Sequence, residues 1–178
     1  WSHTRLQRQK GDIGSFAFAS EFMNDPKTDG SSPIQEKHIR YWTKLPDQYS
    51  VVITLDPAYS DDDKADWKVA TVVAIDQNQN RYLLEYIRTH KPTGEYIDSA
   101  LNLFIKYKDV LTGFGVPCQG TEKEFFKSVQ DKASARGLYP PFNELKNVYT
   151  TSDGKAKTNK HARIVAALQP LFEQGKDY

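Results

Sequence analysis

The sequence predicts an α/β domain with a mixed central sheet flanked by helices. Two apolar, β-branched runs, 49–55 and 69–75, have the character of strands, and the second is nearly all apolar, as in a buried strand. A third run, 81–89, follows directly after a turn sequence, QNQN, so the second and third strands should form a hairpin. Helical and strand patterns then alternate to the end of the chain, which is typical of βα units added to a mixed sheet.

The alternating part begins with a predicted helix over 93–107. The apolar stripe of this helix consists of Ile97, Leu101, Phe104 and Ile105. A short strand is predicted over 113–116. A second helix should start at the capping-box pattern of Thr121 and Glu124, and Gly137 can end it.

Two further elements are predicted near the end of the chain. Residues 147–151 are expected to form a short strand, and the last helix should start near Asn159 and end near Gly175. Pro170 lies inside that helix. Because proline removes a backbone donor and clashes with the preceding turn, it should kink or shorten the helix.

The first quarter of the chain is predicted to be an arm or linker rather than part of the core. Residues 1–10 are polar and basic, as in a frayed helix, and 15–23 is apolar enough to pack on another element. Turn-forming residues are frequent over 24–33. We therefore expect an arm over 1–46 and a core domain over 47–178.

Composition narrows the class of protein. Of the 178 residues, 38% are hydrophobic and 26% are charged, which is ordinary for a globular protein. The net charge of +1 gives no overall attraction to nucleic acid, so any basic surface must be local. The single cysteine, Cys118, excludes an internal disulfide framework, and no apolar stretch of the sequence is long enough to cross a bilayer.

Five aspartates crowd the end of the first predicted strand and the loop after it. Asp56 ends the strand, a run over 61–63 lies in the loop, and Asp66 leads into the second strand. Carboxylates this close repel one another, and a divalent cation relieves the repulsion. Mg²⁺ prefers oxygen ligands, and two ions held by shared carboxylates can hydrolyse a phosphodiester. Asp56 and Asp66 are therefore candidate metal ligands; the competing interpretations are a turn before Pro57, a turn cap at Asp66 and a solvated loop at 61–63.

A second informative stretch is KAKTNKHAR, residues 155–163. It places Lys157, Lys160 and Arg163 in a loop and the first turn of the last helix. Cations at a helix start oppose the helix dipole, so helix stability does not explain them. Free backbone N–H groups at the same place suit a phosphate. We therefore predict that these cations bind a phosphate backbone, with a solvated basic surface as the alternative.

These stretches resemble the nuclease domain of the large terminase subunit of tailed bacteriophages, which has a ribonuclease H-like fold. Residues 18–26 are similar to the segment that joins the packaging ATPase to the nuclease. Leu55-Asp56-Pro57-Ala58 and the later Asp66-Trp67-Lys68-Val69-Ala70 resemble the first metal-binding motif of the family. Residues 115–129 resemble the strand-to-helix stretch around its second acid, and 160–175 its late Lys-x-x-Arg helix.

The resemblance implies an endodeoxyribonuclease that uses Mg²⁺ or Mn²⁺. Such an enzyme cuts concatemeric double-stranded viral DNA during packaging, by two-metal phosphodiester hydrolysis. Asp56 matches the first metal-binding aspartate and Asp66 a nearby acid, and both are thereby assigned to metal binding and catalysis. The implied partners are double-stranded DNA, the packaging ATPase domain of the same subunit, the small terminase subunit and the portal, with no membrane. The implied location is the host cell cytoplasm during virus assembly.

The chain departs from the family pattern at two points. Where the second acid should end a strand, residues 117–119 are Pro-Cys-Gln, and the nearest acid, Glu122, lies in the predicted capping box. We assign Glu122 to the catalytic set on this proximity. The third acid should follow the late helix, beyond Tyr178, so we expect the nuclease domain over 47–178 to be truncated. No P-loop sequence occurs in the chain, and the ATPase half is therefore expected to be absent from it.

Two other functions fit the same residues. One is another ribonuclease H-like nuclease, such as a resolvase or transposase core; the arm with Asn24-Asp25-Pro26 favours a terminase instead. The other is a non-catalytic DNA-binding module, in which the basic helix start holds duplex DNA and an incomplete acid set performs no chemistry. Soaking the protein in Mn²⁺ and counting the ions that it binds distinguishes this module from both nucleases.

Overall fold

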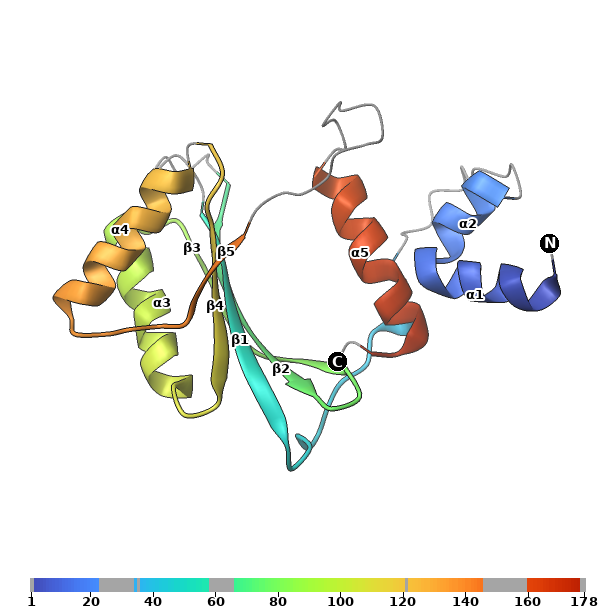
Figure 1. Ribbon diagram of the computed structural model, residues 1–178, viewed down its shortest axis with the longest axis horizontal. Coiled ribbons are helices and arrows are strands. Elements are labelled where there is room, and N and C mark those ends of the chain that lie inside the picture. The colour runs from blue at the N-terminus through green and yellow to red at the C-terminus, as the bar shows by residue number, and fades with distance from the viewer. Residues whose placement is uncertain are drawn as a thin grey trace. The chain divides into compact units, whose positions relative to one another are not determined.

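The computed structural model describes residues 2–22, 34, 36–57, 66–120, 122–145 and 160–176 (Figure 1). Contacts divide the chain into two compact units. One unit, Leu45–Val148, contains the sheet and two helices. The other contains the first two helices, a 3₁₀ turn and the last helix, so it combines segments from both ends of the chain.

The described residues form a five-stranded sheet in the order β3-β2-β1-β4-β5. β1 pairs antiparallel with β2, β2 pairs antiparallel with β3, and both β1–β4 and β4–β5 are parallel pairs. The bounds are Tyr49–Asp56 for β1, Lys68–Asp76 for β2, Arg81–Thr89 for β3, Leu111–Pro117 for β4 and Phe142–Leu145 for β5. This mixed sheet, a hairpin meander continued by parallel strands, confirms the predicted ribonuclease H-like α/β fold.

Two helices, α3 (Thr93–Tyr107) and α4 (Glu122–Ala135), cover one face of the sheet (Figure 1). Alternation along the strands supplies the core beneath them, because successive side chains of a strand point to opposite faces. In β1, Val51, Ile53 and Leu55 are at most 3% exposed. The core residues that meet them from β2 and the helices are Ala70, Val72, Ala74, Tyr96, Ile97, Leu101, Phe125 and Val129.

Polar contacts join the outer sides of the two helices. The ammonium of Lys132 in α4 lies 2.5 Å from the Asp98 carboxylate in α3 and donates to the Gly94 carbonyl at 2.8 Å. Arg136 donates to the Asn102 side chain at 2.7 Å. These pairs are partly exposed, so packing rather than charge holds the helices together.

The other face of the sheet, which we call the second face, carries the alternate residues of the same strands. In β4 these are Gly113 and Gly115, which pair with Val52 and Thr54 of β1. The side chains of Asn143 and Leu145 from β5 lie across the two glycines, because a Cβ atom added at Gly113 would stand 2.8 Å from the Asn143 Oδ1 atom. Glycine at these two positions of β4 therefore leaves room on this face for the side chains of the edge strand.

The first three predicted strands and the helix over 93–107 match the structure to within one residue at each end. β4 is longer than predicted, and β5 at 142–145 was missed because its sequence, FNEL, contains no β-branched residue. The strand predicted over 147–151 lies outside the described residues, as does Thr121 of the predicted capping box. α4 ends as expected, with Gly137 in the left-handed region at a φ of 65°.

The second unit contains α1 (His3–Ile13), α2 (Ser15–Phe22), the 3₁₀ turn η1 (Glu36–His38) and α5 (Lys160–Gln174). The Glu173 carboxylate of α5 accepts hydrogen bonds from the Ser15 backbone N–H at 3.0 Å and the Ser15 hydroxyl at 2.5 Å. An acid there is favourable because Ser15 starts α2. Contacts thus place residues 1–44 and the last helix in the same unit. The sequence had led us to expect that helix in the core domain, 47–178, and not with the arm, 1–46.

α5 continues through Pro170 to Gln174, so the expected shortening at this proline is wrong. The helix ends at Gly175, as predicted, with a φ of 68°. The Lys176 N–H donates to the Leu171 carbonyl at 2.9 Å, which closes the helix end in a Schellman-type turn.

Within the described ranges, no helix is long and apolar enough to span a membrane.

The turn between β2 and β3 is organised by one carboxylate. Asp76, 8% exposed, accepts hydrogen bonds from the backbone N–H groups of Asn78 and Asn80 at 2.8 and 2.9 Å, from the Asn80 amide at 2.8 Å and from the Tyr82 hydroxyl at 3.1 Å. Burial raises the pKa of Asp76, but these hydrogen bonds together outweigh burial and hold the pKa below its ordinary value of 3.8.

The Asp76→Asn variant should therefore melt at a lower temperature than the wild type at pH 7. Asparagine replaces an acceptor oxygen with an amide donor that faces the Asn80 amide and the Tyr82 hydroxyl. The pKa of Asp76 is lower in the folded than in the unfolded protein. The carboxylate therefore stabilises the fold at any pH above its pKa in the unfolded protein, and this stabilisation is lost as the pH falls through its pKa in the folded protein. Melting curves by circular dichroism should thus converge for the two proteins toward pH 3 and below. A difference that is equal at pH 7 and pH 2.5 would contradict this assignment.

Candidate metal and DNA site

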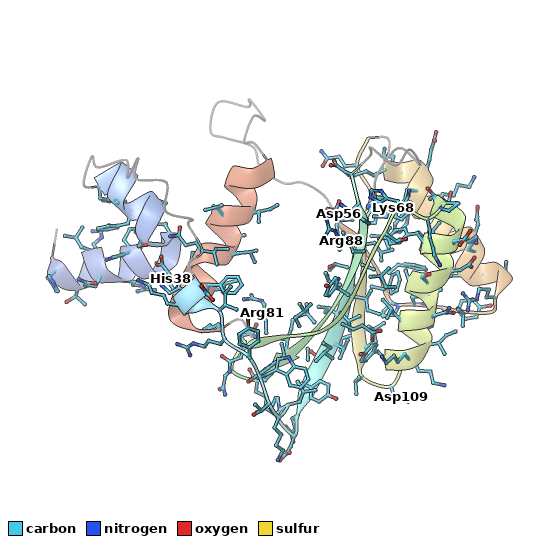
Figure 2. All side chains as sticks on the ribbon, turned by 180° about the vertical axis from the view of Figure 1, so that it is seen from behind. His38, Asp56, Lys68, Arg81, Arg88 and Asp109 are labelled. Atoms are coloured by element: carbon cyan, nitrogen blue, oxygen red, sulfur yellow. The ribbon has the colours of Figure 1, made fainter. Side chains whose placement is uncertain are left out.

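The predicted site residues lie at one edge of the sheet, which we call the acidic edge. It is formed by the C-terminal ends of β1, β3 and β4 and the N-terminal end of β2, because β2 runs antiparallel to its neighbours. Figure 2 shows Asp56, Lys68 and Arg88 at this end of the sheet and Asp109 at the opposite end. Ligands of open α/β sheets bind at such carboxyl ends.

Asp56 is the last residue of β1 and pairs with Val69 of β2. Its side chain is exposed, whereas Leu55 before it is 3% exposed and faces the helices. The alternation of the strand thus turns Asp56 away from the helix-covered core. Position at the end of a central strand and exposure to solvent both suit a metal ligand.

Tyr96 of α3 supports this part of the edge from below. Its ring is fully buried, and its hydroxyl donates to the Val69 carbonyl at 2.6 Å, opposite Asp56. Burial raises the pKa of the Tyr96 phenol far above its usual range, and the Asp56 carboxylate raises it further, although the Asp56 backbone lowers it. Tyr96 therefore stays a neutral donor and anchors β2 at the residue that pairs with Asp56.

Asp66 lies at the same edge, two residues before β2, and is exposed. It is three residues before Val69, which is roughly 10 Å along an extended chain. The structure thus brings Asp56 and Asp66 to one edge without direct pairing. The loop between them, with the aspartate run 61–63, lies outside the described residues.

Lys68 adds a buried cation that the sequence reasoning did not single out. It is 1% exposed and shares the helix-covered face with Ala70 and Val72. The sequence does contain a signal for it. Every second residue of β2 is buried, and Lys68 is a charged residue at one of these buried positions. A buried ammonium needs compensation, and the acidic edge is a place where negative charge gathers.

Glu122, the third predicted catalytic residue, is the first residue of α4. Its carboxylate accepts the Gln119 backbone N–H at 3.3 Å, so it already serves the turn that precedes the helix. The parallel pairing of Thr54 with Gly115 places Pro117 beside Asp56, two residues further along each strand. Residues 117–119, where the resemblance led us to expect a second acid, thus follow β4 at this edge without a carboxylate. Across the described residues, no three His, Cys, Asp or Glu side chains are grouped closely enough to hold a metal ion.

The predicted DNA-binding residues belong to a different element. Lys160 and Arg163 lie in the first turn of α5, in the second unit, and their side chains are outside the described part of the structure, as is all of Lys157. The structure therefore confirms the predicted helix start, and the DNA contact of these cations stays a prediction.

The chain was also compared with known proteins. The strand order β3-β2-β1-β4-β5, with its two antiparallel and two parallel pairs, is that of a ribonuclease H-like α/β fold. No family model and no curated protein matches the sequence. Among solved structures, the chain is similar to the HK97 bacteriophage large terminase, with 10% identity and a TM-score of 0.49 over 99% of this chain and 41% of that one. It is also similar to RuvC of Thermus thermophilus, with 15% identity and a TM-score of 0.37 over 71% of this chain and 97% of that one. The chain thus spans less than half the length of the terminase.

The Tyr96→Phe variant should lower the free energy of unfolding by about 1 kcal/mol, because it removes the hydrogen bond that the buried Tyr96 side chain donates to the Val69 carbonyl. Urea unfolding at neutral pH measures the difference. The matched control is Tyr139→Phe, whose wild-type side chain is 81% exposed and whose loss should change little. Equal stability of the Tyr96→Phe variant and the wild type would show that the hydroxyl does not anchor this edge.

Proposed function

We propose that this chain is the metal-dependent nuclease domain of a viral DNA-packaging terminase. The observation that carries the proposal is the position of Asp56, an exposed carboxylate that ends the central strand of a ribonuclease H-like sheet, with Asp66 at the same edge. The motif order along the sequence supports the terminase assignment. The proposed reaction is hydrolysis of phosphodiester bonds in concatemeric double-stranded DNA.

Asp56 and Asp66 would hold a divalent ion, Mg²⁺ or Mn²⁺. Both offer carboxylate oxygens, which are the ligands that hard cations prefer, and both side chains are accessible. A bound ion supplies an activated water and stabilises the charge on the leaving oxygen. Because the described acids form no group of three, the remaining ligands must be waters, substrate phosphates or carboxylates elsewhere, including the run 61–63.

Glu122 is proposed as a third acid with a smaller part in the reaction. It follows the end of β4, but its carboxylate is engaged with the Gln119 backbone N–H. A group that supports a turn contributes to catalysis only if it changes partner when metal and DNA bind.

The proposed substrate and partners follow from the same assignment. Double-stranded DNA would contact Lys157, Lys160 and Arg163 near the start of α5. The further partners would be a packaging ATPase domain of the same subunit, a small terminase subunit and a portal, with the host cell cytoplasm as the place of action.

A second candidate function is a DNA-binding module without catalysis. The observation in its favour is that no three acids gather within the described ranges. Such a module binds DNA but neither holds Mn²⁺ at Asp56 nor cuts. A titration of the chain with Mn²⁺ therefore distinguishes the two functions. Electron paramagnetic resonance measures the free ion, and the nuclease should remove Mn²⁺ from solution whereas the DNA-binding module should not.

The Asp56→Asn variant should lose both Mn²⁺ binding and metal-dependent cleavage. Asparagine keeps the shape of the side chain but removes the charge, so the ion loses its principal ligand, and cleavage of supercoiled plasmid should fall at least about 100-fold, as expected when several kcal/mol of charge stabilisation are removed. The Mn²⁺ titration reads out the metal site without requiring activity.

The matched control is Asp109→Asn, an exposed aspartate at the opposite end of the sheet (Figure 2). It should bind Mn²⁺ and cut as the wild type does. Glu122→Gln should reduce cleavage less than Asp56→Asn, because Glu122 is already engaged in a turn. Wild-type cleavage by the Asp56→Asn variant would overturn the proposed function.

Changing Lys157, Lys160 and Arg163 together to alanine should weaken DNA binding about equally for all sequences. Each lost phosphate contact lowers the slope of log K against log salt by roughly one, so the slope should fall by up to about three. Binding of a labelled duplex at a series of salt concentrations measures this. A triple variant with the slope of the wild type would show that the helix start is only a solvated surface.

A further inference from the structure

A stack of three side chains, Trp67, Arg88 and His90, lies at the acidic edge and has no part in the function described so far. The Arg88 guanidinium carbon stands 4.2 Å from the centre of the Trp67 ring. The Trp67 and His90 rings have centroids 3.6 Å apart and planes tilted by 42°. We call this group the Trp–Arg–His stack.

The strand register places the stack close to the proposed metal ligand. Asp56 pairs with Val69, and Val69 pairs with Arg88, so these residues form one row across three strands. Residues directly opposite one another point to the same face, and the row therefore puts Arg88 on the second face with Asp56. Neighbouring strands are about 4.8 Å apart, so the backbones of Asp56 and Arg88 are roughly 10 Å apart.

The stack is open to solvent. Trp67 is 42% exposed and Arg88 is exposed, so both side chains stay accessible to a ligand. Arg88 pairs with no carboxylate in the described ranges; the contact that fixes it is the Trp67 ring. Stacking uses the flat face of a guanidinium and leaves its N–H donors, which lie in the plane, free to bind an oxyanion.

We propose that the Trp–Arg–His stack is a phosphate clamp for DNA, in which Arg88 binds a backbone phosphate of the strand that is cut at Asp56. This inference rests on the proposed nuclease function. Trp67 is a positioning residue that holds the guanidinium in one orientation, and His90 packs against Trp67. Because the backbones of Asp56 and Arg88 are roughly 10 Å apart, one DNA strand can reach both, and Arg88 would bind a phosphate close to the one that is cut.

The clamp differs in two ways from the predicted contacts at Lys157, Lys160 and Arg163. It lies on the sheet itself, in the same unit as Asp56, so its distance from the cut is fixed by strand pairing. Its arginine is also held in advance by a ring, which lowers the entropy lost when a phosphate binds.

The test is binding of a fluorescein-labelled 30-base-pair duplex, measured by anisotropy in EDTA so that no cleavage occurs. The Arg88→Gln variant should bind about tenfold more weakly at low salt, as expected for one lost charge-assisted hydrogen bond, and its salt slope should fall by roughly one. Arg88→Lys should keep the slope but lose part of the affinity, because lysine keeps the charge without the planar fork. The matched control is Lys108→Gln, an exposed cation near the opposite end of the sheet, which should bind as the wild type does.

A double-mutant cycle tests the positioning role of Trp67. Trp67→Ala should weaken binding in the wild-type background but have no effect in the Arg88→Gln background, because Trp67 acts only through Arg88. Circular dichroism confirms folding, and Trp67→Leu, which keeps apolar bulk without an aromatic face, replaces the alanine variant if that one fails to fold. Equal effects in both backgrounds would mean that Trp67 stacks on a base itself, and would overturn the clamp.

Unchanged affinity and slope of the Arg88→Gln variant would also overturn the clamp. The two proposals fail separately, since the binding assay contains no metal. A chain that binds DNA through Arg88 but never cuts would refute the nuclease and leave the clamp as a binding site. A chain that cuts DNA while Arg88→Gln binds normally would refute only the clamp.

Discussion

The pairing register of β1 and β2 is the constraint on which the rest of the site depends. It sets Asp56 opposite Val69, and Val69 opposite Arg88, so one row of residues carries both the proposed metal ligand and the proposed phosphate clamp. A slip of one residue would exchange the two faces and bury Asp56 under the helices. The buried β1 residues, the matching row of β2 and the hydrogen bond from Tyr96 to the Val69 carbonyl all oppose such a slip.

Opposite charges share the acidic edge. Asp56 and Asp66 bring negative charge to the ends of two strands, and Lys68 and Arg88 bring positive charge to the same end (Figure 2). Lys68 is buried beneath the edge, whereas Arg88 is exposed and stacked on a ring. Carboxylates and cations at one edge suit the proposed nuclease. The carboxylates would hold a metal ion, and an exposed cation would bind the polyanionic DNA.

The sequence predicted the elements whose pattern is strong. Alternation and β-branched residues identified β1, β2 and β3, and the apolar stripe identified α3, because burial of one face shapes both patterns. β5 was missed because FNEL has no β-branched residue, and the room that Gly113 and Gly115 leave for its side chains lies far away in the sequence. The extent of α5 was predicted, but Pro170 does not shorten it; tertiary contacts such as that of Glu173 with Ser15 support the turn that follows the proline. Asp56 was visible as an acid that ends a strand, but Arg88 became a candidate only once the register aligned it with Asp56.

The central claim is that Asp56 holds a divalent metal at the end of β1. Its most direct test is a crystal of this chain grown with Mn²⁺ and measured at a wavelength that gives anomalous scattering from manganese. We expect an anomalous peak at a coordination distance of about 2.0–2.2 Å from an Asp56 carboxylate oxygen, with Asp66 or its bound water on the same ion. No peak at Asp56 in crystals that hold Mn²⁺ elsewhere on the chain would contradict the claim.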